Sequence, residues 1–238
     1  MSDGRVTRTN ELGQPIGDPV PGWTPRPPTE PEQLVGRRVR LERLRPDHAP
    51  LLHGPMVLES PPSTWTYYPY PDLTDPAAFE AYIAAVLALP AAWPMAVLSP
   101  DGAGLGVSCY LRKDPANGSV EIGSIIYSAA LQRTAAATEA VYLMMSHAFD
   151  DLGYRRFEWK CDSLNEPSRR AAARLGFTYE GRFRQATVYQ GRNRDTDWFS
   201  VTDGEWPTIR AGLEAWLDPA NFDAAGRQVK KLSNFLTT

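Results

Sequence analysis

Hydrophobic and polar residues alternate along the chain with two different periods, and these periods separate strands from helices. In the segment 37–44, Val39 and Leu41 alternate with polar residues, which predicts a half-buried strand. Later apolar segments of strand length are separated by turn residues or helix signals, and the first three are expected to pair antiparallel. These segments are 93–99, 107–112, 120–128, 155–161, one that begins at Phe177, and 192–203.

Helix signals occupy four other segments. Asp75 and Pro76 suit a helix N-cap and first position, and Pro90 ends that helix. A second helix, short and amphipathic, is predicted over residues 205–217. Asn165 begins another helix, which Gly176 ends. The longest helix signal is an apolar face ended by Gly153 and made of Val141, Met144, Met145, Ala148, Phe149 and Leu152.

The order of these elements predicts one α/β domain with a mixed, mostly antiparallel sheet and helices on both faces. We place this domain at 34–217, after a Pro/Gly-rich extension at 1–33 and before a tail at 218–238. The extension is expected to form no helix or sheet of its own, because proline fixes φ and removes a hydrogen-bond donor. Two interpretations stay open for it: Trp23 anchors it to the domain, or it is disordered.

Composition narrows the possible functions. The 238 residues carry a net charge of −3, which argues against direct nucleic-acid binding. No run of about 18 apolar residues predicts a membrane span, and the polar N-terminus lacks a secretory signal, so a cytoplasmic location is expected. Cys109 and Cys161 are expected as buried free thiols. No metal site is expected, because no second ligand type stands at zinc spacing from His48, His53 or His147.

A loop with small side chains connects the expected strand 120–128 to the longest helix. Free amides and a positive dipole end make a helix N-terminus a binding site for phosphate. Ala135, Ala136 and Ala137 would let a pyrophosphate approach these amides, and Arg133 adds a cation. The alternative is an ordinary alanine-rich helix start.

This loop resembles the acetyl-CoA signature of the GNAT superfamily of N-acetyltransferases, Q/R-x-x-G-x-G/A. Gln132, Ala135 and Ala137 match it, with alanine where glycine is commoner, and alanine keeps the backbone amide. The resemblance implies acetyl-CoA as co-substrate and no metal. It implies a cofactor site made of Ile125, Ile126, Tyr127, Gln132, Arg133, Thr134, Ala135, Ala136, Ala137, Thr138, Asn165 and Ser168.

A second motif follows one strand later. In NEPSRRAAARLGF, Asn165 begins a helix that ends in Gly176 and Phe177, as in the second conserved block of the superfamily. Two such motifs in this order are more specific than either alone. The segments YEGRFRQ and GRNRDTDWFS resemble the RimJ/RimL-like branch, which acetylates ribosomal-protein N-termini. The resemblance covers about residues 37–206 and implies the GNAT fold, a sheet splayed around the cofactor.

The implied reaction is direct attack of an amine on the thioester in a ternary complex. The amine must first lose a proton, and the carbonyl oxygen needs a hydrogen-bond donor as charge builds on it. A strand glutamate is the base in the histone-acetylating branch, eleven residues before the loop glutamine, and Glu121 holds that place (132 − 121 = 11). A solvent-facing strand position is the alternative for Glu121. The implied oxyanion donor is a backbone amide near Tyr127, where the family strand bulges.

The general acid departs from the commoner pattern of the superfamily. Many members carry a tyrosine seven residues after the asparagine, where this chain has Ala172. The ribosomal-protein branch has a serine three residues after the asparagine, so Ser168 is implied to donate to the thioester sulfur; an ordinary residue of the first helical turn is the alternative. The glutamate base of that branch is replaced by Thr187, which leaves Glu121 as the expected base.

Acceptor binding is expected on the loop 65–70. An aromatic wall of Trp65, Tyr67, Tyr68 and Tyr70 would cover an amine, and plain packing is the alternative for each. An acidic acceptor would suit Arg182, Arg184, Arg192 and Arg194, although solvated strand faces explain them equally well. The acceptor is expected to be a protein N-terminus or a small-molecule amine.

Two other functions are consistent with the same sequence. A catalytically degenerate acyl-CoA-binding module would explain Ala172, Thr187 and the alanines of the loop. A ribosome- or partner-associated protein would explain the extension. A homodimer is possible, because dimers are common in the superfamily.

Overall fold

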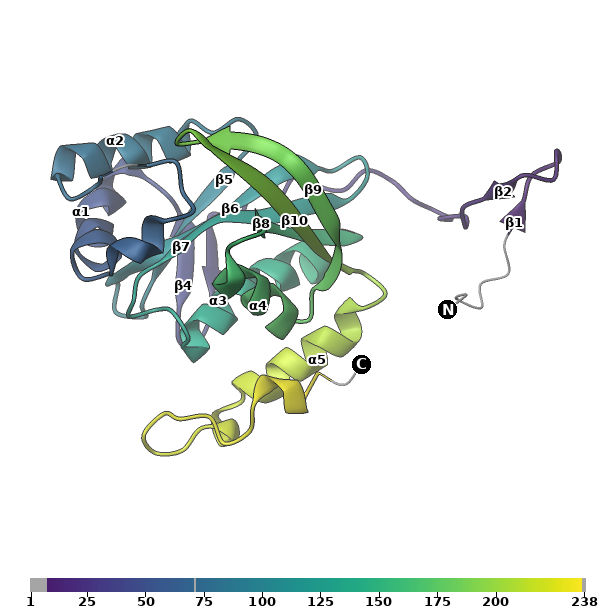
Figure 1. The fold of residues 1–238 in the computed structure, drawn as a ribbon. Helices are drawn as coiled ribbons and strands as arrows, with labels where there is room; N and C mark the ends of the chain where they lie inside the picture. The colour runs from purple at the N-terminus through teal and green to yellow at the C-terminus, as the bar shows by residue number, and fades with distance from the viewer. Residues whose placement is uncertain (1–7, 71, 237–238) are drawn as a thin grey trace.

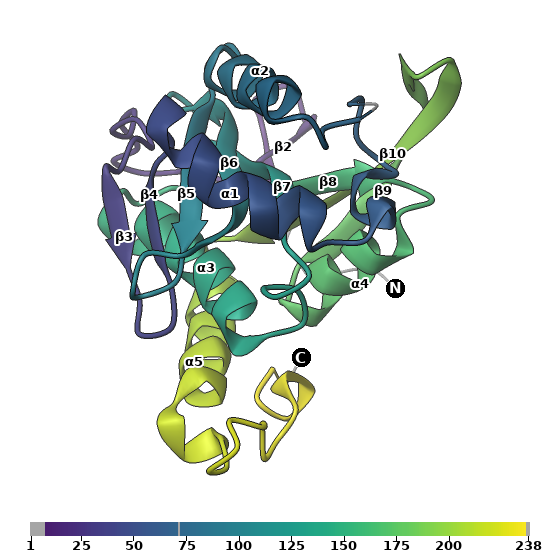
Figure 2. The same cartoon turned by 90° about the vertical axis from the view of Figure 1, so that its left-hand side faces the viewer.

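The computed structural model describes residues 8–70 and 72–236, and its centre is an eight-stranded sheet (Figures 1 and 2). The strand order is β3-β4-β5-β6-β7-β8-β10-β9. Neighbouring strands are antiparallel except for β7 and β8, which are parallel. The strands are β3 (Gln33–Val35), β4 (Arg40–Arg43), β5 (Trp93–Leu98), β6 (Gly104–Asp114), β7 (Ser119–Tyr127), β8 (Arg156–Asp162), β9 (Thr178–Tyr189) and β10 (Arg192–Thr202). The predicted mixed, mostly antiparallel sheet is confirmed.

Helices cover both faces of the sheet, as expected (Figure 1). One face packs against α1 and α2, and the other against α3, α4 and α5. The helices are α1 (Ala49–His53), α2 (Pro76–Leu87), α3 (Ala135–Ser146), α4 (Glu166–Arg174) and α5 (Trp206–Leu217). Side chains begin these helices at the predicted caps, since Asp75 accepts a hydrogen bond from the Ala78 amide. Gly176, at φ +92°, follows α4 in the left-handed conformation that glycine tolerates.

The longest predicted helix is α3, continued by one π turn over residues 147–151. Val141, Met144 and Met145 are buried against the sheet, as their spacing predicts. Both cysteines, Cys109 and Cys161, are buried free thiols, which confirms that expectation. Among the described residues, no helix has the length and apolar character to span a membrane, and no cluster of metal-ligating side chains occurs.

The N-terminal extension differs from its prediction. β1 (Arg8–Thr9) and β2 (Pro15–Ile16) pair into a short ribbon that stands away from the body in Figure 1. The expectation of no sheet in this segment was wrong for residues 8–16. Its physical reason is a tight turn in which the Asn10 side chain accepts hydrogen bonds from two backbone amides, and the prolines do not interrupt that turn.

Trp23 joins the extension to the body. Its indole N–H donates to the Ala116 carbonyl at 2.9 Å. The guanidinium groups of Arg26 and Arg155 lie over its ring, at 4.6 and 5.3 Å from the centroid. Of the two interpretations given for the extension, the structure therefore shows the one in which Trp23 anchors it to the domain. At the other end of the chain, Leu232 of the tail is buried in the core beside α5.

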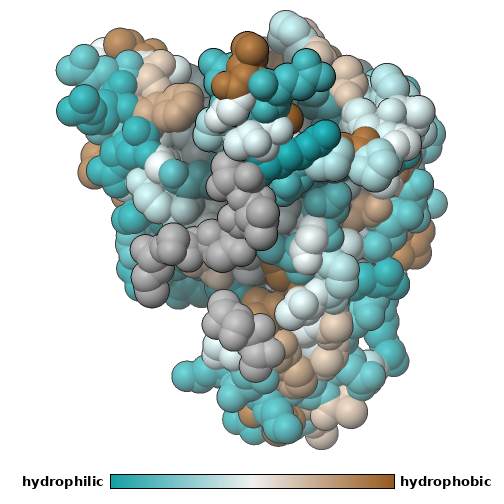
Figure 3. All heavy atoms as spheres, turned by 90° about the vertical axis from the view of Figure 1, so that its right-hand side faces the viewer, coloured by the Kyte–Doolittle hydropathy of each residue, from teal (hydrophilic) through white to brown (hydrophobic). Residues whose placement is uncertain are grey.

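The β9–β10 hairpin forms the free edge of the sheet and projects beyond it (Figure 2). Two register shifts interrupt its ladder, and Gln185 has a left-handed φ of +50° at one of them. Such bulges bend and twist a strand. Figure 3 shows the projecting hairpin as a mostly hydrophilic protrusion with isolated hydrophobic atoms.

Candidate active site

β7 and β8 pair along only part of their lengths. Their parallel ladder runs from Ser119 with Arg156 to Ile122 with Trp159, although both strands continue further. Beyond this point Ser124 adopts φ +48°, and the register between β6 and β7 shifts. The bulge turns β7, so the two strands diverge and leave a gap between their C-terminal halves. This is the splay that the family resemblance implies.

Ile125 and Tyr127 point backbone polar groups into the gap. The Ser128 amide donates to β6 at 2.9 Å, and because alternate residues face opposite strand edges, Ile125 and Tyr127 face away from β6. The Ile125 carbonyl accepts a hydrogen bond from the Tyr68 hydroxyl. The Tyr127 carbonyl accepts one from Gln132 Nε2 at 2.8 Å. The amides of Ile125 and Tyr127 face the same gap, where an oxyanion donor is expected.

The side chains of these strand residues have a structural role. Ile126 is buried in the core under α1 and α2. Ile125 and Tyr127 pack against the core on the opposite face. Burial raises the pKa of the Tyr127 hydroxyl, whose oxygen is enclosed without a hydrogen-bond partner among the described residues. The cofactor would therefore meet the backbone of these residues.

The first turn of α3 lies at the end of β7. Thr134 caps the helix, because its Oγ1 accepts from the Ala137 amide at 3.2 Å and donates to the Leu131 carbonyl at 2.6 Å. The amides of Ala135 and Ala136 have no carbonyl one turn earlier to pair with. Those two amides, beside small and half-exposed alanine side chains, form a candidate phosphate-binding site.

Arg133 and Thr138, at the two ends of this loop, differ in exposure. Arg133 is exposed, with φ +62°. Thr138 is buried, and its hydroxyl accepts a hydrogen bond from Arg174 of α4 at 3.0 Å. The Thr138 amide already pairs with the Thr134 carbonyl. Thr138 thus ties α3 to α4, whereas Arg133 has a side chain free to meet a phosphate.

The N-terminus of α4 stands on the β8 side of the gap. The Asn165 Oδ1 accepts from the Ser168 amide at 3.1 Å, so the predicted cap is present. The Ser168 hydroxyl accepts from the Trp159 indole at 3.0 Å, which fixes its oxygen and leaves its proton to be donated. Cys161 lies beside it, and burial raises the pKa of that thiol to about 11. Ala172, in contrast, is fully buried in the core, so no acid stands at that position.

Glu121 lies on the other face of the sheet, below the gap, with 1 % of its surface exposed. The solvent-facing alternative therefore does not hold. Its Oε2 is 3.1 Å from Lys160 Nζ and 3.7 Å from Arg112 Nε. Its Oε1 lies over Gly123, where a Cβ atom would be only 2.7 Å from that oxygen. One carboxylate oxygen is thus held by cations, and the other points along β7 towards the gap.

Burial raises the pKa of Glu121, and the nearby Lys160 and Arg112 charges oppose this effect only in part. A carboxylate with a raised pKa is a stronger base than a solvated one. The Lys160 contact has ion-pair distance without good hydrogen-bond alignment, since Glu121 Oε2 has no aligned donor among the described residues. Lys160 could not be predicted from sequence, because the pairing of β7 with β8 joins distant segments.

The four aromatic residues of the loop 65–70 separate into two pairs. Trp65 and Tyr70 pack edge-to-face on Tyr82 of α2, with centroids at 5.3 and 4.8 Å, so packing explains them. Tyr68 reaches the gap through its bond to β7. Tyr67 donates at 2.8 Å to a carbonyl in the turn between β8 and α4. Only Tyr67 and Tyr68 thus stand where an acceptor would approach.

The tip of the β9–β10 hairpin lies on the same side of the gap as Tyr67 and Tyr68. Gln190 Nε2 donates to the Tyr68 carbonyl at 3.0 Å, and Arg192 donates to the Thr66 carbonyl at 3.3 Å. Tyr189 donates to Asp162 Oδ2, at the end of β8, at 2.9 Å. These contacts could not be predicted, because no local sequence pattern relates a hairpin tip to a loop some 120 residues earlier. Thr187 is exposed on β9.

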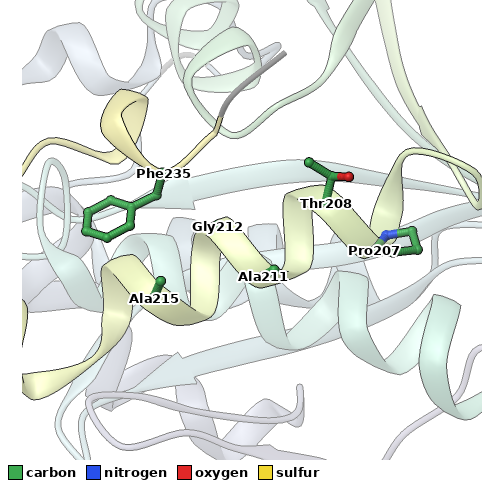
Figure 4. A pocket seen from close by; sticks show the side chains of 6 residues that line it. All are labelled: Pro207, Thr208, Ala211, Gly212, Ala215 and Phe235. Carbon is green, nitrogen blue, oxygen red and sulfur yellow. The ribbon is translucent and has the colours of Figure 1, made fainter.

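A separate hollow of about 470 Å³ runs along α5 (Figure 4). None of its lining residues belongs to the gap or to the loops around it. The lining residues are Pro207, Thr208, Ala211, Gly212, Ala215 and Phe235. This hollow is therefore separate from the gap between β7 and β8.

Comparisons with known proteins agree with this geometry. The family model described as an acetyltransferase (GNAT) domain matches residues 38–178. A GCN5-related N-acetyltransferase from Brucella melitensis is 44 % identical over 91 % of this chain and 99 % of its own, with a TM-score of 0.88. A probable GNAT-family acetyltransferase from Chromobacterium violaceum ATCC 12472 is 38 % identical over 82 % and 98 %, with a TM-score of 0.75.

A more distant similarity shows the fold alone. Mycobacterium smegmatis RimJ, solved in complex with CoA-disulfide, is 20 % identical over 79 % of this chain and 95 % of its own, with a TM-score of 0.64. No curated protein matches the sequence. The domain match and the two close structures, together with the splayed strands, show that this chain belongs to the GNAT family and is an acetyl-CoA-dependent acetyltransferase.

Proposed function

We propose that the enzyme acetylates a primary amine, either a protein N-terminus or a small molecule, by direct attack in a ternary complex. One observation carries the proposal: β7 and β8 part between two helix N-termini, beside a buried glutamate whose free oxygen points to the gap. A substrate threaded through this gap would meet backbone amides on one side and an acceptor opening on the other. Bound acetyl-CoA would supply the acyl thioester.

The residues present fit acetyl-CoA. The amides of Ala135 and Ala136 and the Arg133 side chain suit its pyrophosphate. The backbone of Ile125 and Tyr127, free of β6, suits its extended amide-containing arm, and the same amides would donate to the carbonyl oxygen during attack. The RimJ structure with CoA-disulfide supports this choice of cofactor by analogy of fold.

Ser168 and Glu121 are proposed to handle the protons. Ser168, oriented by the Trp159 indole, donates towards the sulfur as it leaves. Glu121 takes the proton of the amine. Four residues of strand separate Glu121 from Ile125, about 13 Å at roughly 3.3 Å per residue, so the proton would pass from the amine through bound water and end on the Glu121 oxygen over Gly123.

The test is acetyl transfer measured by release of free CoA thiol, over a panel of amines and N-terminal peptides. We expect Glu121→Gln to lower kcat at least about tenfold and to leave CoA affinity unchanged by calorimetry. Glu158→Gln is the matched control, because Glu158 pairs with Glu121 across the sheet but is bonded to Arg156 at 2.7 Å. Equal losses in both variants would contradict the role of Glu121.

The pH profile gives a second readout of Glu121. The base must be ionised, so the rate falls as pH falls through the pKa of Glu121, which burial raises above the ordinary 4.5. Glu121→Gln is expected to lose this acidic limb. An identical acidic limb in the variant would assign it to another group. Absence of transfer to every amine, with CoA bound, would overturn the proposed function.

A further inference from the structure

The hairpin arginines differ in what they already bind. Arg182 forms two hydrogen bonds with Asp197, at 2.7 and 3.1 Å. Arg192 is held by the Gln190 side chain at 2.6 Å. Arg184 is exposed, and Arg194 is half-buried. Across residues 8–70 and 72–236, neither Arg184 nor Arg194 has a carboxylate within ion-pair distance.

Arg194 lies on the face of the sheet that carries Glu121. On β10, residues alternate between faces, so Arg194 shares the face of Thr196 and Trp198. Thr196 pairs with Asp162, and Trp198 pairs with Lys160, the cation beside Glu121. Arg194 therefore stands just beyond the end of β8, where the gap opens.

Asp162, at the end of β8, already has hydrogen-bond partners, but the Nε of Arg194 does not. The Arg194 Nε is buried and has no hydrogen-bond partner among the described residues. Asp162 accepts hydrogen bonds from the Tyr189 hydroxyl and the Leu164 amide, both at 2.9 Å. A buried guanidinium N–H without an acceptor costs free energy, and an incoming anion would recover it.

Tyr68 connects Arg194 to the position of acetyl transfer. The charge of Arg194 is close enough to lower the pKa of Tyr68 and of Tyr189 against the larger raising effect of burial. The Tyr68 hydroxyl itself donates to the Ile125 carbonyl in the gap. An anion held by Arg194 would thus lie on the side of the gap where Tyr68 contacts β7.

We propose that Arg194 binds a carboxylate of the acceptor, so that the acceptor is an amine with a carboxylate near its amino group. This inference rests on the proposed function, since it names the substrate class of the same site. A guanidinium matches a carboxylate through two parallel hydrogen bonds. Two sources supply that chemistry: the α-carboxylate of a free amino acid, and the acidic first side chain of a peptide.

The experiment compares kcat/KM for matched acceptors that differ only in charge. The pairs are an amino acid and its amide, and peptides beginning with Glu or with Gln; a neutral primary amine is the reference. The wild type is expected to prefer one carboxylate acceptor over its neutral partner by at least about tenfold. The pair that shows this preference identifies the source of the carboxylate.

Arg194→Gln is expected to reduce this preference to about one, with no change for the neutral amine or in CoA affinity, and Arg194→Lys to keep part of it. Arg184→Gln is the matched control, because Arg184 is exposed on the same hairpin. Equal loss on charged and neutral acceptors would overturn the inference, and so would a wild type without charge preference. Either of these two results would leave the proposed function intact. Absence of transfer to any amine would overturn both the inference and the proposed function.

Discussion

The two oxygens of Glu121 are placed for different tasks, and one glycine makes this possible. Oε2 lies 3.1 Å from the Lys160 ammonium group, at ion-pair distance. Oε1 occupies the space where any other residue at position 123 would have its Cβ. The spacing to Gln132 predicted that Glu121 is the base, but the need for Gly123 follows only from the folded strand.

Gly123→Ala tests this placement. The new Cβ would lie 2.7 Å from Glu121 Oε1 and 2.6 Å from a Leu111 methyl, so the carboxylate must move. We expect kcat to fall at least about tenfold and the free energy of unfolding to fall by about 1–3 kcal/mol, with CoA affinity unchanged. Gly204→Ala is the control, because nothing lies within 4 Å of its Cβ position. Wild-type kcat in the first variant would disprove the positioning role of Gly123.

At the scale of an element, the N-terminus of α3 combines local strain with a binding surface. The strand-to-helix turn passes through Arg133 in the left-handed region, which costs an ordinary residue about 1–2 kcal/mol. The exposed guanidinium at this strained position stands next to the unpaired amides of Ala135 and Ala136. Arg133 thus places a charge beside the proposed phosphate site at a position where glycine would relieve the backbone.

Arg133→Gly is expected to separate these two effects. The free energy of unfolding should rise by about 0.5–1 kcal/mol, because relief of strain exceeds the entropy that glycine adds to the unfolded chain. CoA should bind several-fold more weakly without the charge. Arg133→Ala should weaken CoA binding equally with no gain in stability. Urea unfolding and calorimetry would measure both quantities, and equal stability of the two variants would refute the strain.

At the scale of the whole molecule, the N-terminal extension and the C-terminal tail attach to the central domain in different ways. The tail is buried through Leu232. The extension is attached by Trp23, which crosses to the turn between β6 and β7, and by hydrogen bonds between residues 26–31 and the body. Its outer ribbon stands clear of the body in Figure 1. Among the described residues, those proposed for catalysis make no hydrogen bond to Trp23, so attachment and catalysis are expected to be independent.

Trp23→Ala should release the extension without impairing the enzyme. Loss of the hydrogen bond to Ala116 and of the aromatic contact is expected to make residues 8–25 sensitive to protease, because residues 26–30 keep their own hydrogen bonds to the body, with kcat within about twofold of wild type. Limited proteolysis with mass spectrometry would locate the cuts. Leu12→Ala is the control, since Leu12 is 81 % exposed in the same segment. Unchanged cleavage in Trp23→Ala would place the attachment elsewhere.

The sequence predicted the elements of the fold better than the contacts between them. Caps such as Asp75 and Asn165, and the alternation of Val39 and Leu41, are local signals, and each was confirmed. The divergence of β7 from β8 depends on the bulge at Ser124, which no sequence pattern predicts. The contact of Lys160 with Glu121 joins two strands whose pairing is set by the tertiary fold.

The bulged strand at the edge of the sheet has a consequence for the protein in concentrated solution. A long, flat edge strand is a template on which further chains can add and grow into fibres. β9 has 12 residues and exposes Tyr179, Phe183 and Val188. The left-handed Gln185 breaks its row of hydrogen-bonding groups, and nearby arginines add repulsion between copies. The distortion that bends this hairpin is thus also expected to hinder aggregation of the molecule.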